Sequence, residues 1–279
     1  MRRIVVRTLS RELRLHTDSD EAFAGLSYVG ADPIMPDATL APVDLKVEPS
    51  GSFFRIEPPG RAAIEGSINA IMNGVFRLLA NWLTDDARGS PILHAAMAVI
   101  EGERFVFLGD KGFGKTTLVL SLIEQGIAVE GDEHVVVTPG GAITRPRRLH
   151  VKESSLDLVP SLRDAIRSSP SNTDWMGNRI YACRPSLRGA SWQIAEGSID
   201  HLVFVEPNFG GSSILSPVSR DEAFARLLET TFMPSAQQGG AAVRLRKLCV
   251  DAGLWRLQAG DLGQAHRHLL TVAEFAKQN

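Results

Sequence analysis

The sequence is short of the features that mark secreted, membrane-spanning and nucleic-acid-binding proteins. Its two cysteines, Cys183 and Cys249, are too few for a disulfide framework, and we expect both to be reduced and buried. No uncharged apolar run reaches the roughly 18 residues that a membrane-spanning helix needs, and the N-terminus lacks the apolar stretch of a signal peptide. The formal net charge of −2 gives no electrostatic case for nucleic acid or an anionic membrane. We therefore expect a cytoplasmic protein with neither as a partner.

What remains is the composition of a globular α/β protein. The chain has 279 residues, of which 44% are hydrophobic and 22% charged, enough for a core domain with a smaller companion. The pattern of apolar and turn residues predicts an N-terminal α/β lobe over 1–88 and a larger α/β domain over 89–279.

In the N-terminal lobe we expect short strands over 3–9, 12–16 and 52–56. The stretch 30–42 is rich in Pro, Asp and Ala and predicts a loop. Apolar residues recur at three- and four-residue steps over 63–83, which predicts a helix with one apolar face. We expect this helix to pack the lobe onto the larger domain.

The larger domain opens with two strand candidates, 94–100 and 104–108, joined by a very tight turn. Strands joined so closely must pair antiparallel, which predicts a mixed sheet rather than an all-parallel one. The segment 154–190 is polar and has no clear period. The other predicted elements are a strand over 127–129, a hairpin over 134–144, a strand over 201–205, and helices over 220–228, 241–250 and 263–275.

The strongest motif is Gly109-Asp110-Lys111-Gly112-Phe113-Gly114-Lys115-Thr116, which fits the phosphate-loop pattern G-x-x-x-x-G-K-[ST] without departure. It joins a predicted strand to a predicted helix over 116–125, where free backbone N–H groups and the helix dipole favour a phosphate. We expect these residues, with Thr117, to bind ATP. Lys115 would contact the β- and γ-phosphates, and the Thr116 hydroxyl would complete a Mg²⁺ shell. For Lys111 a solvated loop lysine is the favoured interpretation.

An acidic cluster, Glu130-Gly131-Asp132-Glu133-His134, follows the strand after the loop helix. Ligands of open α/β sheets bind outside the carboxyl ends of strands, so Asp132 and Glu133 are predicted to face the γ-phosphate. A carboxylate there can accept a proton from an attacking hydroxyl or hold magnesium. A solvated acidic turn is the alternative. His94, taken alone, is more typical of a structural histidine.

The stretch from His94 to His134 resembles the catalytic domain of the HPr kinase/phosphorylase family, whose fold resembles phosphoenolpyruvate carboxykinase. That family has a histidine ahead of the strand pair, a phosphate loop, a helix that ends in glycine, and an acidic pair. This chain matches it with His94, residues 109–116, Gly126 and Asp132-Glu133. The resemblance implies that Asp132 is the catalytic acid/base, that His94 stands near it, and that Thr116 serves magnesium. The chain looks still more like related proteins of bacterial biosynthetic clusters, including those that tailor lasso peptides.

The chain also departs from that family. Its acidic pair contains Glu133 where the family usually has a second aspartate. The family signature Leu-Glu-Ile-Arg-Gly, whose glutamate helps to bind metal, is missing, and Glu153 in Leu149-His150-Val151-Lys152-Glu153 is a weak candidate for that role. This loss weakens any expectation of reverse phosphorylase activity. Because HPr kinases are oligomeric, the resemblance also makes a homo-oligomer plausible.

Two further features carry alternatives. Arg145, Arg147 and Arg148 with His150 could grip phosphate or an acidic acceptor, although a solvated face is the favoured interpretation. Glu206 follows four apolar residues and resembles the carboxylate of a Walker B strand, although a structural carboxylate at a strand end is the favoured interpretation.

The leading hypothesis is therefore an ATP- and Mg²⁺-dependent kinase with Asp132, His94 and Lys115 as catalytic residues. Its acceptor would be a hydroxyl, a serine on a peptide or small protein, although a small metabolite stays open. The alternatives are a phosphate-loop ATPase or switch protein that uses Glu206, and a nucleotide-binding escort subunit without catalysis.

Overall fold

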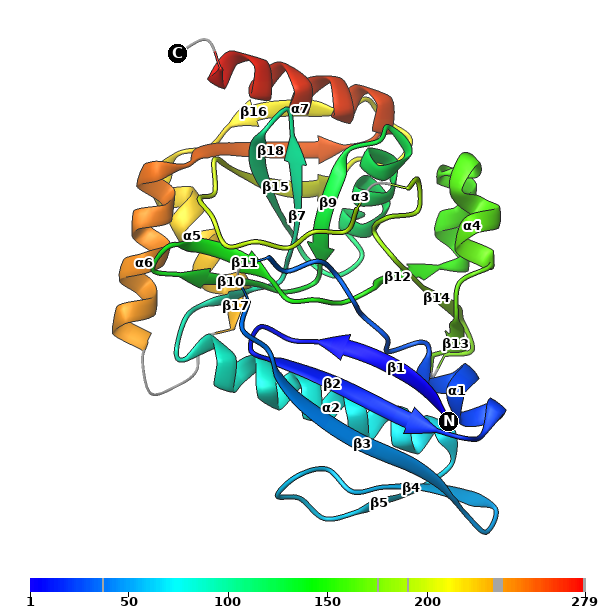
Figure 1. Ribbon diagram of the computed structural model, residues 1–279. Coiled ribbons are helices and arrows are strands. Elements are labelled where there is room, and N and C mark those ends of the chain that lie inside the picture. The colour runs from blue at the N-terminus through cyan, green and yellow to red at the C-terminus, as the bar shows by residue number, and fades with distance from the viewer. Residues whose placement is uncertain (37, 175, 190, 233–237, 278–279) are drawn as a thin grey trace.

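The computed structural model describes residues 1–36, 38–174, 176–189, 191–232 and 238–277. Residue 37 of the predicted loop and residues 175 and 190 of the predicted irregular segment lie outside this description. In Figure 1 an N-terminal lobe lies below a larger body, and each is built around its own β-sheet. The predicted domain boundary after residue 88 stays a prediction.

A five-stranded sheet forms the N-terminal lobe, in the order β1-β2-β3-β4-β5. β2 and β3 run parallel, whereas the other neighbouring strands pair antiparallel. Two helices, α1 (Asp20–Leu26) and α2 (Ile68–Ala87), bury their apolar faces in the same hydrophobic core as this sheet. The strands are β1 (Arg2–Arg7), β2 (Arg11–Thr17), β3 (Ala41–Ser50), β4 (Phe53–Ile56) and β5 (Ile64–Gly66).

The sequence predicted most of this lobe but not all of it. The strands expected over 3–9, 12–16 and 52–56 are confirmed as β1, β2 and β4. The expected loop ends where β3 begins, and β3 itself was not predicted. The predicted helix starts later than expected, at Ile68, because Ser67 caps it by accepting a hydrogen bond from the Ala70 N–H, 3.4 Å away.

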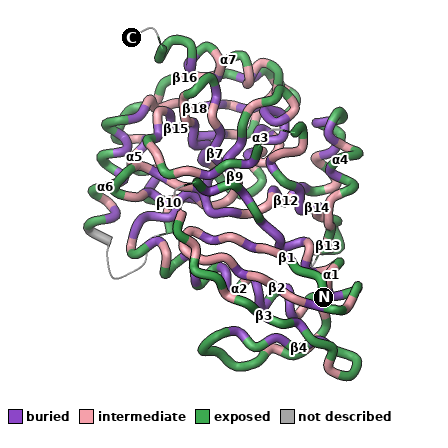
Figure 2. Tube along the Cα trace, in the orientation of Figure 1, coloured by how far each residue is buried: buried purple, intermediate pink, exposed green. Residues whose placement is uncertain are grey.

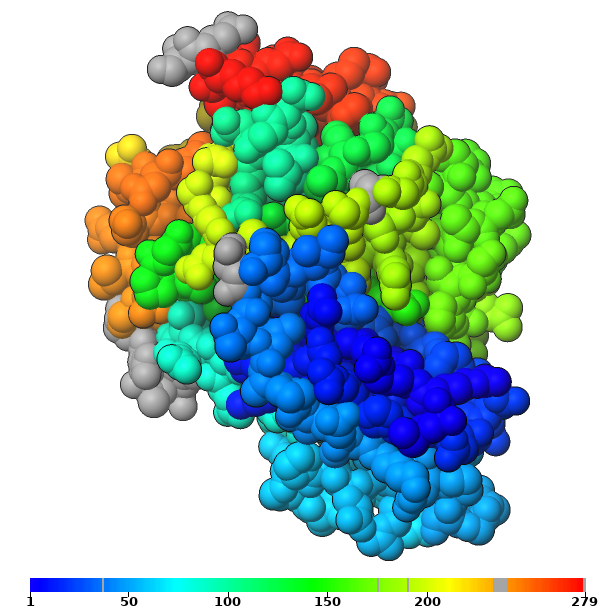
Figure 3. Space-filling view, in the orientation of Figure 1, coloured from blue at the N-terminus to red at the C-terminus, as the bar shows by residue number. Residues whose placement is uncertain are grey.

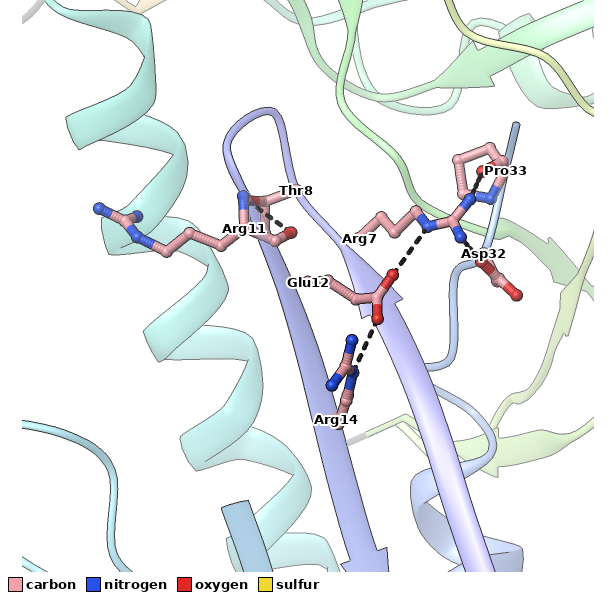
Figure 4. A network of polar contacts seen from close by, with 7 residues as sticks. All are labelled: Arg7, Thr8, Arg11, Glu12, Arg14, Asp32 and Pro33. Carbon is pink, nitrogen blue, oxygen red and sulfur yellow. Dashed lines mark hydrogen bonds and ion pairs between the residues drawn. The ribbon is translucent and has the colours of Figure 1, made fainter. Parts of the chain in front are cut away.

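A polar network ties the β1–β2 hairpin to the segment that follows α1 (Figure 4). The Arg7 guanidinium donates to the Pro33 carbonyl and forms ion pairs with Asp32, at 3.1 Å, and Glu12, at 3.3 Å. Glu12 also pairs with Arg14 at 2.8 Å. These contacts hold the start of the 31–36 stretch against the sheet.

The larger body is built on a six-stranded mixed sheet in the order β16-β18-β15-β8-β7-β9. β18, β15 and β8 run parallel, and β7 pairs antiparallel with both β8 and β9. The expected mixed sheet is thus confirmed. In the β7–β8 turn, Glu101 and Gly102 both have positive φ, 53° and 89°, as a tight hairpin requires. The strands are β7 (Ala95–Ile100), β8 (Glu103–Leu108), β9 (Ala128–Asp132), β15 (His201–Pro207), β16 (Ile214–Pro217) and β18 (Gly253–Ala259).

The two faces of this sheet are covered by different helices. Phe105, Phe107 and Val205 point to one face, where α3 (Lys115–Glu124) and α7 (Leu262–Ala276) complete the core. Val106 and Phe204 alternate with them and face α5 (Arg220–Thr230) and α6 (Gln238–Asp251). Figure 2 shows buried positions along these central strands. The four helices agree with the sequence prediction.

Two small sheets connect the lobes, one in the order β11-β10-β6-β17 and one in the order β12-β14-β13. The first contains the predicted hairpin. The sequence did not predict β14 in the second small sheet, nor β16 and β18 in the six-stranded sheet. The remaining elements are β6 (Ile92–Leu93), β10 (Val135–Thr138), β11 (Gly141–Thr144), β12 (Leu149–Lys152), η1 (Glu153–Leu158), η2 (Pro160–Leu162), α4 (Arg163–Arg167), β13 (Ser171–Thr173), β14 (Arg179–Cys183) and β17 (Thr231–Phe232).

A late segment of the chain completes the core of the N-terminal lobe. Trp192 and Ile194 are buried in it, and Ile34 exchanges backbone hydrogen bonds of 2.8 and 2.9 Å with them. Figure 3 shows this contact at the surface, where the yellow-green segment meets the blue lobe. Cys183 and Cys249 are free and buried, as expected. Within the described ranges, no helix combines the length and the apolar character needed to cross a membrane.

Candidate active site

The predicted phosphate loop connects β8 directly to α3. Gly109, Gly112 and Gly114 all have positive φ, at 153°, 92° and 91°. A Cβ on Gly109 would lie 2.6 Å from the Val205 carbonyl oxygen, so only glycine fits there. Gly114 is the N-cap of α3, and no side chain of the described residues caps this end. The backbone N–H groups of the first turn are therefore available to an anion.

Lys115 is folded into the loop that it belongs to. It is buried, and its Nζ donates to the carbonyl oxygens of Gly109, at 2.6 Å, and Asp110, at 3.1 Å. Burial lowers the pKa of Lys115, while the charges of Asp132 and Asp110 act in the opposite direction. The ammonium group is thus held at the phosphate loop.

The other loop residues differ in exposure. Asp110, Lys111 and Gly112 are exposed, which agrees with a solvated Lys111. Phe113 and Thr117 are half-buried, and the Phe113 N–H donates to Asp110 O at 3.2 Å. This bond fixes the turn at the tip of the loop.

A β-bulge in β9 aims Asp132 at α3. Asp132 lies opposite Ala96 on β7 and Val129 lies opposite Ala98, and both alanines belong to the core on the α3 face. The register shifts between these two pairs, so β9 has one extra residue. Strict alternation would place Val129 and Asp132 on opposite faces, and the extra residue brings both to the same face.

Asp132 consequently meets the first turn of α3. The Thr116 hydroxyl donates to Asp132 Oδ2 at 2.5 Å. Burial raises the pKa of Asp132, whereas the Thr116 hydrogen bond and the charges of Lys115, His94 and Arg147 lower it. Burial prevails, so the pKa of Asp132 is raised, and a carboxylate with a raised pKa is a better proton acceptor near neutral pH. Asp132 therefore lies beside the phosphate loop, where the sequence predicted it.

His94 lies between β6 and β7, half-buried beside the same carboxylate. Its Nδ1 lies 3.2 Å from the Glu133 carbonyl oxygen, which can only accept, so this nitrogen carries the proton. Burial and the charge of Lys115 lower the pKa of His94, against the pull of Asp132. His94 is therefore neutral at pH 7, with Nε2 as a hydrogen-bond acceptor.

Glu133 has an unusual backbone conformation. Its φ of 103° is rare for a residue with a side chain. Its N–H and C=O groups pair with Ala95, at 2.9 and 3.3 Å, and its carboxylate forms an ion pair with Arg147. The carboxylate that was predicted as a weak metal ligand is thus engaged by an arginine.

The basic cluster is not a solvated face, so that interpretation is wrong. Arg145 is 8% exposed, and burial lowers its pKa to about 10. Arg147 donates to His150 Nδ1 at 2.6 Å, and Arg148 donates to the carbonyls of Gly30 and Ala182. The N-terminal lobe covers this cluster, which local sequence cannot reveal.

Two aromatic residues of the N-terminal lobe take part in that cover and were not predicted. The Tyr28 ring lies 4.8 Å from the His150 ring, and the Arg147 guanidinium lies 5.8 Å from the Phe76 ring. Burial raises the pKa of Tyr28 to about 12. The periodicity of α2 marks Phe76 as part of a helix, but no local signal links it to the site.

Two other predicted residues are engaged elsewhere. Glu206 forms ion pairs with Arg226, at 2.7 Å, and Arg256, at 3.5 Å. Glu153 pairs with Arg167 at 2.6 Å and accepts from the Tyr181 hydroxyl at 2.5 Å. The residues that the structure brings together at the loop are Lys115, Thr116, Asp132 and His94, with Glu133 and Arg147 beside them.

Comparisons with known proteins give remote structural similarity alone. No family model matches the chain, and no curated protein matches it. Among solved structures, the HPr(Ser) kinase/phosphatase from Coxiella burnetii is similar over 67% of this chain and 97% of the Coxiella chain. The sequence identity is 10% and the TM-score is 0.32. A TM-score this low carries no argument about function.

Proposed function

We propose that the chain is an ATP-dependent kinase that transfers the γ-phosphoryl group to a hydroxyl acceptor, a serine of a peptide or small protein. One observation carries this proposal, namely the 2.5 Å hydrogen bond between Thr116 of the phosphate loop and Asp132. It sets a carboxylate beside the loop residues that would hold the triphosphate. A base within reach of that phosphate is what transfer to a hydroxyl requires.

The chemistry follows from the placement of these groups. Backbone N–H groups of the loop and Lys115 would bind the β- and γ-phosphates and orient them. The acceptor oxygen attacks the γ-phosphorus, and the bond to the β–γ bridging oxygen breaks, which releases ADP. Asp132 takes the hydroxyl proton and later returns it to water. Neutral His94 is a positioning residue beside Asp132.

The donor set also fits magnesium. Thr116 and Asp132 offer hard oxygen atoms at the phosphate loop, and Mg²⁺ prefers one or two protein oxygens together with phosphate oxygens and water. In the parts of the chain that the structure describes, no three His, Cys, Asp or Glu side chains could hold a metal among them. A bound Mg²⁺ would offset the charge on the phosphates. For Glu133 to contribute, it would have to leave Arg147.

The test is transfer of labelled γ-phosphate from ATP to a library of serine-containing peptides. We expect transfer by the wild type and its loss in Asp132→Asn, with ATP still bound. ATP hydrolysis that is lost only in Glu206→Gln would favour the ATPase instead. Tight ATP binding without transfer or hydrolysis would favour the escort subunit, and either outcome would overturn the kinase.

A further inference from the structure

Two histidines lie side by side, His94 directly after β6 and His134 directly before β10, next to the proposed catalytic carboxylate. Ala95 and Glu133 exchange both backbone hydrogen bonds, and Leu93 pairs with Val135. The positions between these pairs, His94 and His134, are therefore cross-strand neighbours with side chains on one face.

Arg145 extends this row onto the next strand. Val135 pairs with Thr144, and the Arg145 N–H donates to His134 O at 3.0 Å. Arg145 is therefore the cross-strand neighbour of His134 on the same face. Neighbouring strands lie about 4.8 Å apart, so the Cα of Arg145 is about 10 Å from that of His94.

Two members of this row, Arg145 and His134, have side-chain nitrogens without a partner among the described residues. Arg145 is buried, and burial alone lowers its pKa, with no hydrogen bond or ion pair from a described residue acting on the guanidinium. The Nδ1 atom of His134 is likewise buried without a partner among the described residues. Burial, followed by the charges of Arg145 and His94, lowers the pKa of His134 to about 4, so the ring is neutral at pH 7. A neutral ring can donate one N–H group.

The surroundings do not compensate the charge of Arg145. The carboxylate of Glu133 pairs with Arg147, and Arg148 donates to two backbone carbonyls. A buried charge without a counterion is costly, and buried charges in proteins are ordinarily paired. The guanidinium of Arg145 therefore carries a positive charge that no neighbouring carboxylate in the described part of the chain neutralises.

We propose that Arg145, with His134 beside it, binds an anionic group that the phosphoryl acceptor carries, while the acceptor hydroxyl lies at Asp132. This inference rests on the proposed kinase function. A guanidinium binds a carboxylate or a phosphate through two parallel hydrogen bonds. The Cα atoms of Arg145 and of His94, the residue beside Asp132, are about 10 Å apart, which equals about three residues of extended chain at roughly 3.3–3.6 Å per residue, so this is the spacing to test.

The first test uses inorganic phosphate and acetate as probes. Each is titrated calorimetrically into the full chain saturated with Mg²⁺ and a non-hydrolysable ATP analogue, so that the phosphate loop is filled. We expect the wild type to bind at least one probe, and Arg145→Met to bind it at least tenfold more weakly. The choice between the probes identifies a phosphate or a carboxylate ligand. Arg188→Met, which changes an exposed arginine bonded to Ser161, is the control.

Thermal unfolding separates a ligand-binding arginine from a structural one. Removal of an unpaired buried charge should raise the Tm of the ligand-free protein by about 2–4 °C in Arg145→Met. A lower Tm combined with unchanged probe binding, or no binding of either probe to the wild type, would overturn the proposal.

The second test separates this inference from the kinase function. Serine peptides with Asp, phosphoserine or Ala three residues away serve as acceptors. We expect a tenfold or greater preference in kcat/KM for the anionic peptides, lost in Arg145→Met. Equal transfer to all peptides would overturn the anion site and leave the kinase. Probe binding at Arg145 without transfer to any peptide would overturn the kinase and leave the anion site.

Discussion

Asp132 and Glu206 stand at the carboxyl ends of two strands of one sheet, yet their surroundings differ completely. The bulge in β9 turns Asp132 toward α3, where it accepts a hydrogen bond from Thr116. Glu206 keeps strict alternation with Phe204 and meets the arginines of the α5 face. The comparison teaches that the face of the sheet, rather than the presence of a carboxylate, decides which strand end serves the loop.

The largest expected effect is on phosphoryl transfer. Asp132→Asn removes the proton acceptor, and general-base catalysis is worth about 10²–10⁴-fold in rate. Single-turnover transfer should fall by that factor, while the Kd for ATP stays within a few-fold. The matched change Glu206→Gln should leave the rate unaltered. Equal loss in both variants would contradict the contrast between the two strand ends.

A smaller effect concerns the close contact between the loop and β15. In Gly109→Ala the new Cβ meets the Val205 carbonyl at a strained φ, which should destabilise the fold by about 1–3 kcal/mol and weaken ATP binding. Gly112→Ala shares a positive φ but meets open space, so it should cost less. Urea unfolding of both variants checks this, and equal costs would contradict the role of the Val205 contact.

The burial of His134 near the candidate site should also make the stability of the fold depend on pH. The folded pKa of His134 is about 4, below its ordinary value near 6.5. At a pH between these two pKa values the unfolded chain binds a proton at His134 that the folded chain does not bind, so the free energy of unfolding falls as the pH falls. This residue should cost about 2 kcal/mol between pH 7 and pH 5.

Urea unfolding at both pH values measures that cost. In His134→Asn the loss of stability between pH 7 and pH 5 should shrink by that amount. An unchanged loss in His134→Asn would show that His134 is not held neutral by burial.

The smallest effect belongs to the Glu206 ion pairs. Their side chains are partly exposed, at 28% for Glu206 and 29% for Arg226, so solvent screens them. Glu206→Gln should therefore lower the free energy of unfolding by at most about 1 kcal/mol. A loss well above this in chemical denaturation would mean that this network matters more to the fold than its exposure indicates.

The sequence predicted the local parts of this account. The loop glycines and Lys115 follow from a motif, and the antiparallel β7–β8 pair follows from a two-residue turn. The approach of Asp132 to the loop follows from the rule about strand ends. Each of these features is set by a few neighbouring residues, so it can be predicted from the sequence alone.

What the sequence could not show depends on long-range packing. The bulge in β9 is defined by its register against β7, and β18 joins the sheet only by pairing with β15. The cover over Arg147 comes from Phe76 of α2, a helix that lies far away in the sequence. Local composition favoured a solvated basic face there, and the packing of the lobe overrode it.

A crystal structure of the chain with Mg²⁺ and a non-hydrolysable ATP analogue tests the central claim most directly. The account predicts the γ-phosphate on Lys115 and the N-terminus of α3, with the Asp132 carboxylate next to it and Glu206 still paired with Arg226. A nucleotide bound away from residues 109–116, or an Asp132 carboxylate turned to the face of α5 and α6, would contradict it.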